Sequence, residues 1–166
     1  GRYNEALTYF QEVRNVSKLE ISNMAEEKIL YLHENHENAI KANRKKIVFF
    51  VKPGADSFID DLIDGLSEEY ETKKILVTSY NQIDEGLIWA DICWFEWCDD
   101  LLVYGSKTTC AKDKIIICRI HGYEVYGELI SKPDWTNVDH LMLPLILKGF
   151  LKRELKKSIR ATCEVA

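Results

Sequence analysis

Apolar residues recur at helical spacing through the first forty positions of the chain. One face of a first predicted helix carries Ala6, Leu7, Phe10 and Val13. A second predicted helix begins at Ser17, which has Glu20 three residues later, the spacing of a capping box, and its apolar stripe runs to about Asn35. The pattern therefore predicts an α-helical hairpin over residues 1–40.

From Lys45 onward, short continuous apolar runs alternate with segments of helical spacing. The runs are typical of buried strands and comprise KKIVFFV (45–51), KKILVTS (73–79), DICWFEW (91–97), KIIICRI (114–120) and VDHLML (138–143). The intervening helices are predicted near residues 58–66, 83–88 and 99–111. Asp56 or Ser57 can cap the first of them and Asp99 the last. Strands that alternate with helices predict an α/β fold, a Rossmann-like open parallel sheet over residues 45–166.

Composition and charge narrow the class of protein. The chain has 166 residues, 46% hydrophobic and 30% charged, with only 8 Gly and 3 Pro, which excludes collagen-like and low-complexity chains. No apolar run approaches the ~20 residues of a membrane helix and the start lacks a secretory signal, so we expect a cytoplasmic protein. Residues 45–144 carry 10 basic and 18 acidic side chains, which argues against a nucleic-acid partner.

The cysteines and the first residue add two further expectations. Five cysteines without a C-x-x-C pair fit neither a disulfide framework nor a zinc site, so we expect structural cysteines and no metal. The chain does not begin with Met, and we expect it to be an excised piece of a longer protein.

The stretch RIHGYE, residues 119–124, is the leading candidate for chemistry, because ligands of such sheets bind beyond the carboxyl ends of the strands. His121 can donate, accept or carry charge near neutral pH, and Gly122 lets the backbone approach a ligand closely. Glu124 is a nearby carboxylate that could orient the histidine. The alternative is that His121 only ends the strand and binds a backbone group.

A second candidate is WFEWCDD, residues 94–100, where Glu96 lies between two tryptophans of an apolar run. A carboxylate in that setting must be paired, hydrogen-bonded or close to the solvent-exposed end of the strand. One interpretation has Glu96, Asp99 or Asp100 bind hydroxyls of a polar ligand. The other makes Asp99 a helix cap and Glu96 an ion-pair partner of Arg119 on the next strand.

Two further segments could contact anions. The loop KPGADS, residues 52–57, has one glycine and lacks the glycine fingerprints of dinucleotide and P-loop sites, so we expect no cofactor. The helix that follows could still favour an anion there; a plain turn is the alternative. The basic segment 148–160, in a helix predicted from Pro144 onward, could lie on anionic lipid at the inner membrane face, or it could be a solvated outer face.

A family resemblance is carried by ADICWFEWCDDLLVYGSK, KIIICRIHGYEVY and WTNVDHLM. The run from Lys45 to about His140 resembles the N-terminal half of family 4 (group 1) glycosyltransferases, which have the GT-B architecture. This resemblance implies an acceptor-side domain for a carbohydrate or lipid-linked acceptor, with the nucleotide-sugar donor bound by a C-terminal domain that this chain lacks.

The same resemblance implies roles for individual residues. His121 matches the cleft histidine near the transferred sugar, and Pro53 and Gly54 match the first loop close to the donor phosphate and the acceptor. Glu96 and Asp99 match substrate-binding positions, and Gly122 and Glu124 belong to the matching His-Gly-Tyr-Glu stretch.

The opening GRYNEALTYFQEV resembles the second helix of a tetratricopeptide repeat. One partial repeat cannot bury its own apolar stripe, so we expect residues 1–40 to pack on the α/β domain or on another chain. Taken together, these expectations describe a glycosyltransferase fragment that is inactive or nearly so alone. The alternative is a non-catalytic Rossmann-like module for protein contacts.

Overall fold

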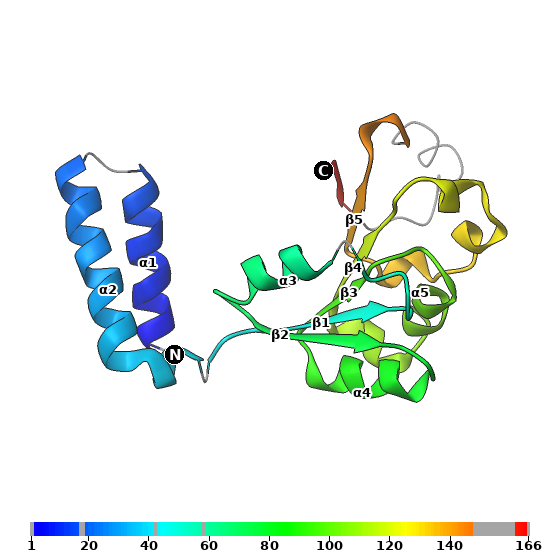
Figure 1. The fold of residues 1–166 in the computed structure, drawn as a ribbon, viewed down its shortest axis with the longest axis horizontal. Coiled ribbons are helices and arrows are strands. Elements are labelled where there is room, and N and C mark those ends of the chain that lie inside the picture. Colours follow the sequence, from blue (N-terminus) through cyan, green and yellow to red (C-terminus); the bar gives the residue numbers. More distant parts are fainter. Residues whose placement is uncertain (1, 17–18, 42, 58, 148–161, 166) are drawn as a thin grey trace. The chain divides into compact units, whose positions relative to one another are not determined.

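The structure is a computed structural model, and it describes residues 2–16, 19–41, 43–57, 59–147 and 162–165 (Figure 1). The chain divides into two compact units, residues 1–44 and residues 45–166. Each unit is described by itself.

The first unit consists of the helices α1 (Arg2–Val16) and α2 (Leu19–Lys41). The side chain of Asn4 donates to the carbonyl of Ile40 (3.2 Å), and Ser22 Oγ donates to the carbonyl of Arg14 (3.1 Å). Because these bonds join the start of α1 to the end of α2 and the end of α1 to the start of α2, the helices run antiparallel. The predicted cap, Ser17, lies outside the described residues.

The helix α2 continues to Lys41, beyond the predicted end near Asn35. His36 has a non-helical φ of −134° and marks a kink, and its ring stacks on Tyr3 with the centroids 4.0 Å apart. The predicted apolar stripe of α2 is only partly covered, since Ala25 is buried whereas Met24 is exposed.

The second unit is a Rossmann-like α/β fold built on a six-stranded sheet in the order β2-β1-β3-β4-β5-β6. Every neighbouring pair is parallel. The strands are β1 (Lys46–Val51), β2 (Glu71–Leu76), β3 (Ile92–Phe95), β4 (Ile115–Arg119), β5 (His140–Leu143) and β6 (Thr162–Val165). The α-helices are α3 (Asp60–Leu66), α4 (Asn81–Trp89) and α5 (Asp100–Gly105). Short 3-10 helices cover Thr109–Asp113, Tyr123–Tyr126, Glu128–Ser131, Trp135–Asn137 and Leu145–Leu147.

Helices cover both faces of this sheet, and Figure 1 shows α3 and α4 on opposite sides. Alternate residues of a strand point to opposite faces, so Phe50 and Phe95 join one hydrophobic cluster with residues of α4 and α5. Phe49 and Trp94 join the other, against which residues of α3 pack. Burial on both faces explains why β1 and β3 are continuous apolar runs.

Three expectations about these elements need correction. The predicted strand 73–79 is an edge strand, β2, which starts at Glu71 and is not buried on both faces. The helix α3 has no side-chain cap, because the carboxylate of Asp56 pairs with Lys74 (3.1 Å) instead. The predicted helix 99–111 is divided: α5 ends at Gly105 and a separate 3-10 helix follows. The predicted helix segment 148–160 lies outside the described residues.

Candidate functional site

The carboxyl ends of β1, β3 and β4 lie next to one another because these strands are neighbours in the parallel sheet. The connection from β1 leads to β2 on one side, whereas β3 pairs with β1 on its other side. This reversal of strand order is the point at which open α/β sheets bind their ligands.

Glu96 directly follows β3, and its side chain is only 1% exposed. Its Oε1 accepts hydrogen bonds from Arg119, at 3.1 Å from Nε and at closer range from Nη2, and Oε2 accepts from Trp94 Nε1 (2.9 Å). The same Oε1 lies 3.0 Å from Nε2 of His121. The predicted ion pair between Glu96 and Arg119 is therefore confirmed, and protein donors satisfy the buried carboxylate.

Two contacts hold the side chain of His121: Nε2, at the edge of the ring, lies against Glu96, and the face of the ring lies against Trp97. The imidazole, 24% exposed, stacks on Trp97 with the centroids 3.9 Å apart and an angle of 26° between the planes. Trp97 is fixed in turn, because its Nε1 donates to the carbonyl of Ala55 in the loop after β1 (3.0 Å). The loop that contains Pro53 and Gly54 is thus joined to the histidine through Trp97.

Glu124 acts on the backbone of this segment. Its buried carboxylate accepts from the backbone N–H of His121 (3.1 Å) and from that of Gly122 (2.8 Å). Gly122 has a φ of +147°, which favours glycine. The sequence predicts that Glu124 orients the histidine, whereas the carboxylate that contacts the imidazole is that of Glu96, 25 residues away in the chain.

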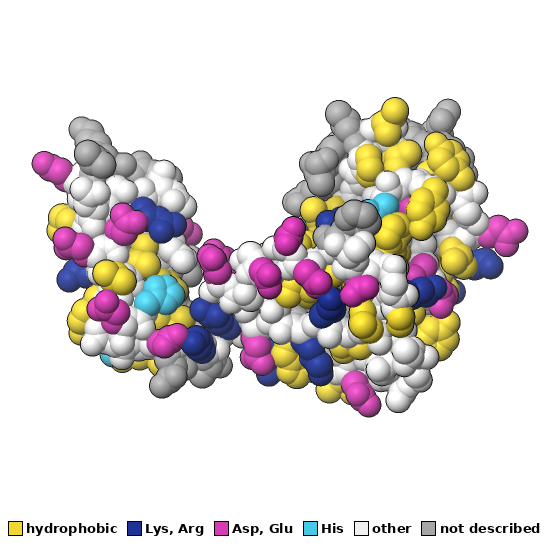
Figure 2. Space-filling model, in the orientation of Figure 1, with side chains coloured by type: hydrophobic (Ala, Val, Ile, Leu, Met, Phe, Trp, Pro, Cys, Tyr) yellow, Lys and Arg dark blue, Asp and Glu magenta, His cyan; other side chains and the backbone are white. Residues whose placement is uncertain are grey.

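Exposed aromatic side chains lie in the segment that follows the histidine in the chain. Figure 2 shows hydrophobic side chains at the surface of the α/β unit, and those of the segment after β4 include Tyr123 and Tyr126, which are 71% and 73% exposed. The ring of Tyr123 lies 5.8 Å from that of Trp97. An aromatic surface therefore adjoins a polar cluster.

A second polar cluster surrounds Lys52, which sequence reasoning did not single out although it directly follows β1. The ammonium group pairs with Asp100 and lies 3.3 Å from Asp99, and Tyr80 donates its hydroxyl to Asp100 (3.2 Å). Asp99 caps α5, as predicted, by accepting from the N–H of Leu101 (2.9 Å).

These groups have shifted pKa values. Burial lowers the pKa of Lys52, but hydrogen bonds and charge from Asp100 and Asp99 outweigh burial and leave it raised. Burial raises the pKa of Asp99, and Lys52 opposes this only in part. Burial also acts to raise the pKa of Asp100, yet the hydrogen bond from Lys52 holds it below its ordinary value.

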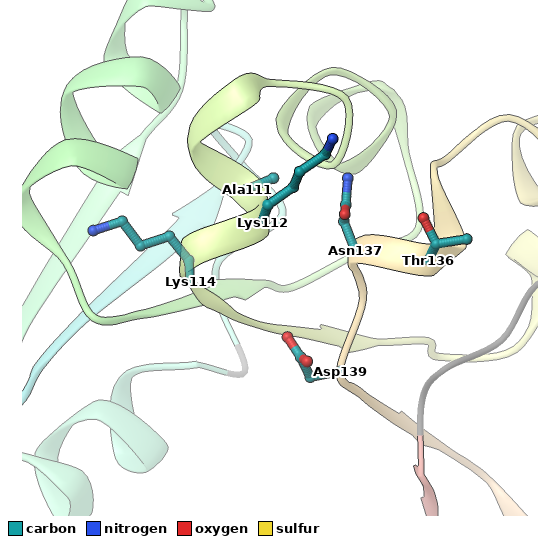
Figure 3. A pocket seen from close by; sticks show the side chains of 6 residues that line it. All are labelled: Ala111, Lys112, Lys114, Thr136, Asn137 and Asp139. Carbon is teal, nitrogen blue, oxygen red and sulfur yellow. The ribbon is translucent and has the colours of Figure 1, made fainter.

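A pocket of about 390 Å³ lies at the opposite edge of the sheet (Figure 3). It is lined by Ala111, Lys112, Lys114, Thr136, Asn137 and Asp139. Lys114 precedes β4 and donates to the carbonyl of Ala90 (2.7 Å), while Asp139 precedes β5 and accepts from the N–H of Ile116 (2.9 Å). These two charged groups bind the backbone, and the pocket is separate from the site at the carboxyl edge.

Cys93, Cys98 and Cys118 are buried and Cys110 is half-buried, and none of these four forms a disulfide. Burial raises the pKa of the Cys93 thiol to about 12, and it raises the pKa of Cys118 well above the ordinary value. Both thiols are therefore protonated at neutral pH and unreactive. Within the described ranges, no three His, Cys, Asp or Glu side chains are grouped so that they could hold a metal ion. Nor does any helix in those ranges have the length and apolarity to cross a membrane.

The fold and the site define a Rossmann-like protein with a histidine held between a buried carboxylate and a tryptophan. Comparison of the chain with protein-family models, with curated proteins and with solved structures found no match.

Proposed function

We propose that the α/β unit is the acceptor-side half of a glycosyltransferase, which moves a sugar from a nucleotide-sugar donor to a hydroxyl of a carbohydrate or lipid-linked acceptor. The observation that carries this proposal is the fixed position of His121, between Glu96 and Trp97 at the carboxyl edge of the sheet. The same histidine lies in the stretch that resembles family 4 glycosyltransferases.

The surroundings of the histidine suit a polyhydroxylated ligand. A sugar ring presents apolar C–H groups that can pack on aromatic faces, and Trp97 and Tyr123 offer such faces beside His121. Its hydroxyls need charged or polar partners, and Asp100 with Lys52 supplies both acceptor and donor groups. Binding sites for small molecules commonly combine these two features.

In the proposed reaction, His121 binds the reacting hydroxyl and aligns it with the anomeric carbon of the donor. The first loop, with Pro53 and Gly54, would approach the donor phosphate through its backbone amides, and a second domain would hold the nucleotide. Alignment of two bound substrates and stabilisation of the departing diphosphate would account for the rate.

The test is release of nucleoside diphosphate by the natural full-length protein, assayed with a panel of nucleotide sugars and acceptors. Replacement of His121 by alanine should lower turnover by about 100-fold or more, the range of a positioned acid or base. The matched control is His33→Ala in the helical unit, which should retain wild-type turnover. Unchanged turnover in the His121→Ala protein would refute the assigned role.

We also propose a peripheral membrane contact through the basic segment 148–160, on its sequence alone. Flotation of the protein with vesicles of anionic lipid should exceed flotation with neutral vesicles, and equal flotation would remove this proposal.

A further inference from the structure

We infer that three exposed side chains at the carboxyl edge of the sheet, Tyr123, Tyr126 and Ile146, form a surface that rests on anionic lipid. This membrane surface borders the candidate site, so the acceptor of the proposed transfer is the lipid-linked one. The membrane surface stands on the described residues and on the charge of the sequence beside them, whereas the choice of acceptor rests on the proposed function.

The two tyrosines belong to one short 3-10 helix, Tyr123–Tyr126, which follows β4. Side chains three residues apart lie on the same side of a 3-10 helix, so both tyrosines share one face. Both are exposed, whereas Glu124 and Val125 between them are buried. The acidic side chain of this turn therefore faces inward, and its outward face is aromatic.

Ile146 lies in the segment that follows β5, in the 3-10 helix Leu145–Leu147. Leu147 is buried in the core, whereas Ile146 is 88% exposed. The strands β4 and β5 are parallel neighbours, and the N–H of Ile120 donates to the carbonyl of Met142 (2.8 Å) where β4 ends. Ile146 and the two tyrosines therefore lie at the same edge of the sheet, and Figure 2 shows hydrophobic side chains gathered at this end of the α/β unit.

The charge of the adjoining sequence favours an anionic bilayer as the occupant of the membrane surface. Residues 148–160 carry six basic side chains and one acidic side chain, whereas residues 45–144 carry 10 basic and 18 acidic side chains. Basic side chains attract anionic lipid, and tyrosine is enriched at the level of the lipid headgroups. A protein partner is the alternative occupant, and the vesicle assay below distinguishes the two.

The membrane surface reaches the candidate site through Tyr123. Its ring lies 5.8 Å from that of Trp97, and Trp97 donates in turn to the carbonyl of Ala55 in the loop after β1. A sugar bound beside Trp97 would thus lie next to the bilayer. An acceptor whose lipid stays in the bilayer can reach this position, and its confinement to the bilayer raises its effective concentration at the site.

The first measurement is flotation of the whole 166-residue chain with vesicles of equal parts phosphatidylcholine and phosphatidylserine. We expect the wild type to float with these vesicles. Ile146→Ser should lower the partition coefficient by about 10-fold, because it loses the transfer of one large apolar side chain, and Tyr123→Ser should lower it in the same direction.

The matched control is Ile88→Ser. Ile88 is 71% exposed, but it lies in the last turn of α4, which leads to the amino end of β3. This variant removes the same side chain from the opposite edge of the sheet and should partition like the wild type. All three replaced side chains are exposed, so we expect the variants to fold, and circular dichroism checks this.

Four outcomes would overturn the membrane surface. The wild type could fail to float, which would favour a protein partner, or it could float equally well with phosphatidylcholine alone. Ile146→Ser and Tyr123→Ser could both partition like the wild type, or Ile88→Ser could lose as much binding as Ile146→Ser.

The second measurement is release of nucleoside diphosphate by the natural full-length protein, with each acceptor sugar of the panel offered free in solution or linked to a lipid in the same vesicles. We expect turnover of the lipid-linked form to exceed that of the free form by at least about 10-fold, and Ile146→Ser to reduce this ratio. Equal turnover of the two forms would overturn the choice of acceptor. Flotation as expected in a protein that turns over no nucleotide sugar would instead refute the proposed function and leave the membrane surface intact.

Discussion

Replacement of Gly105 by alanine should destabilise the α/β unit, because the helix α5 lies directly on an aromatic ring of the sheet. A Cβ atom at this position would lie 2.3 Å from Cζ and 2.9 Å from Cε1 of Phe95. Phe95 is fully buried, and its ring lies against that of Phe50 with the centroids 4.9 Å apart. The ring therefore has no free space into which it could withdraw.

Two opposing effects set the magnitude. Overpacking of a core costs about 1–3 kcal/mol, while alanine gains at most about 1 kcal/mol over glycine from its helix propensity. We expect a net loss of about 1–2 kcal/mol from Gly105→Ala. The matched control is Gly65→Ala in α3, where a Cβ atom would meet nothing within 4 Å. At position 65 only the gain in helix propensity from alanine remains, so Gly65→Ala should be as stable as the wild type or more stable.

Urea unfolding followed by tryptophan fluorescence measures this difference. All four tryptophans lie between residues 45 and 166, so the signal reports the α/β unit although the chain has two units. With a slope of about 2 kcal/mol per molar urea, the midpoint for Gly105→Ala should fall by about 0.5–1 M. A double-mutant cycle with Phe95→Leu should show that the smaller side chain relieves the clash. The reasoning is refuted if Gly105→Ala matches Gly65→Ala in stability, or if the cycle shows no coupling.

Three further predictions concern the site. Gly122→Ala should cost about 1–3 kcal/mol in the same assay, since a Cβ atom there meets nothing and the cost comes from the φ of +147° alone; an effect below about 0.5 kcal/mol would contradict this. Asp99→Ala removes the cap of α5 and should lower the stability of the unit by about 1 kcal/mol in thermal unfolding, and no loss would contradict the cap. Lys52→Met should raise the pKa of Asp100, because the ammonium group is what holds it low against burial. Carboxyl ¹³C titration measures this shift, and Lys74→Met should leave Asp100 unchanged. Since a lowered carboxyl pKa stabilises the fold where the group is ionised, the advantage that the wild type gains through Asp100 should be full above the raised pKa of Asp100 in Lys52→Met. It should disappear as the pH falls below the lowered pKa of Asp100 in the wild type.

The strands at the centre of the sheet could be predicted because their burial is evident from the consecutive apolar residues of each strand itself. Residues 47–51 and 92–95 form unbroken apolar runs. Such runs are typical of strands that have a neighbour on each side and helices on both faces of the sheet. The edge strand β2 (Glu71–Leu76) differs from the predicted strand 73–79 both in its ends and in its burial. Two consecutive lysines within this strand, Lys73 and Lys74, are the local feature of the sequence that indicates an edge strand of the sheet.

The site could be predicted in part for a related reason. The ion pair of Glu96 with Arg119 follows from the register of two adjacent parallel strands, in which Phe95 lies opposite Cys118. The contact of Glu96 with His121 was missed, although the sequence carried a signal. Arg119 and His121 are two residues apart and so point to the same side of an extended chain, which means that a carboxylate within reach of one is near the other. The stacking of Trp97 on His121 had no such signal, because it depends on the path of two loops.

The free-energy cost of burying the Glu96 carboxylate raises the question of why a charged residue lies beside Arg119 and His121. Replacing a buried ion pair with apolar side chains of similar volume is often neutral or stabilising, so an ion pair whose carboxylate is 1% exposed is a poor means of holding two strands together. What an apolar residue could not do is form a hydrogen bond with Nε2 of His121. The carboxylate of Glu96 is therefore better explained by its contact with the histidine than by stability. Removing the carboxylate alone, as in Glu96→Met, should nevertheless lower the urea midpoint of the α/β unit, because the Arg119 guanidinium loses the charge that compensates it.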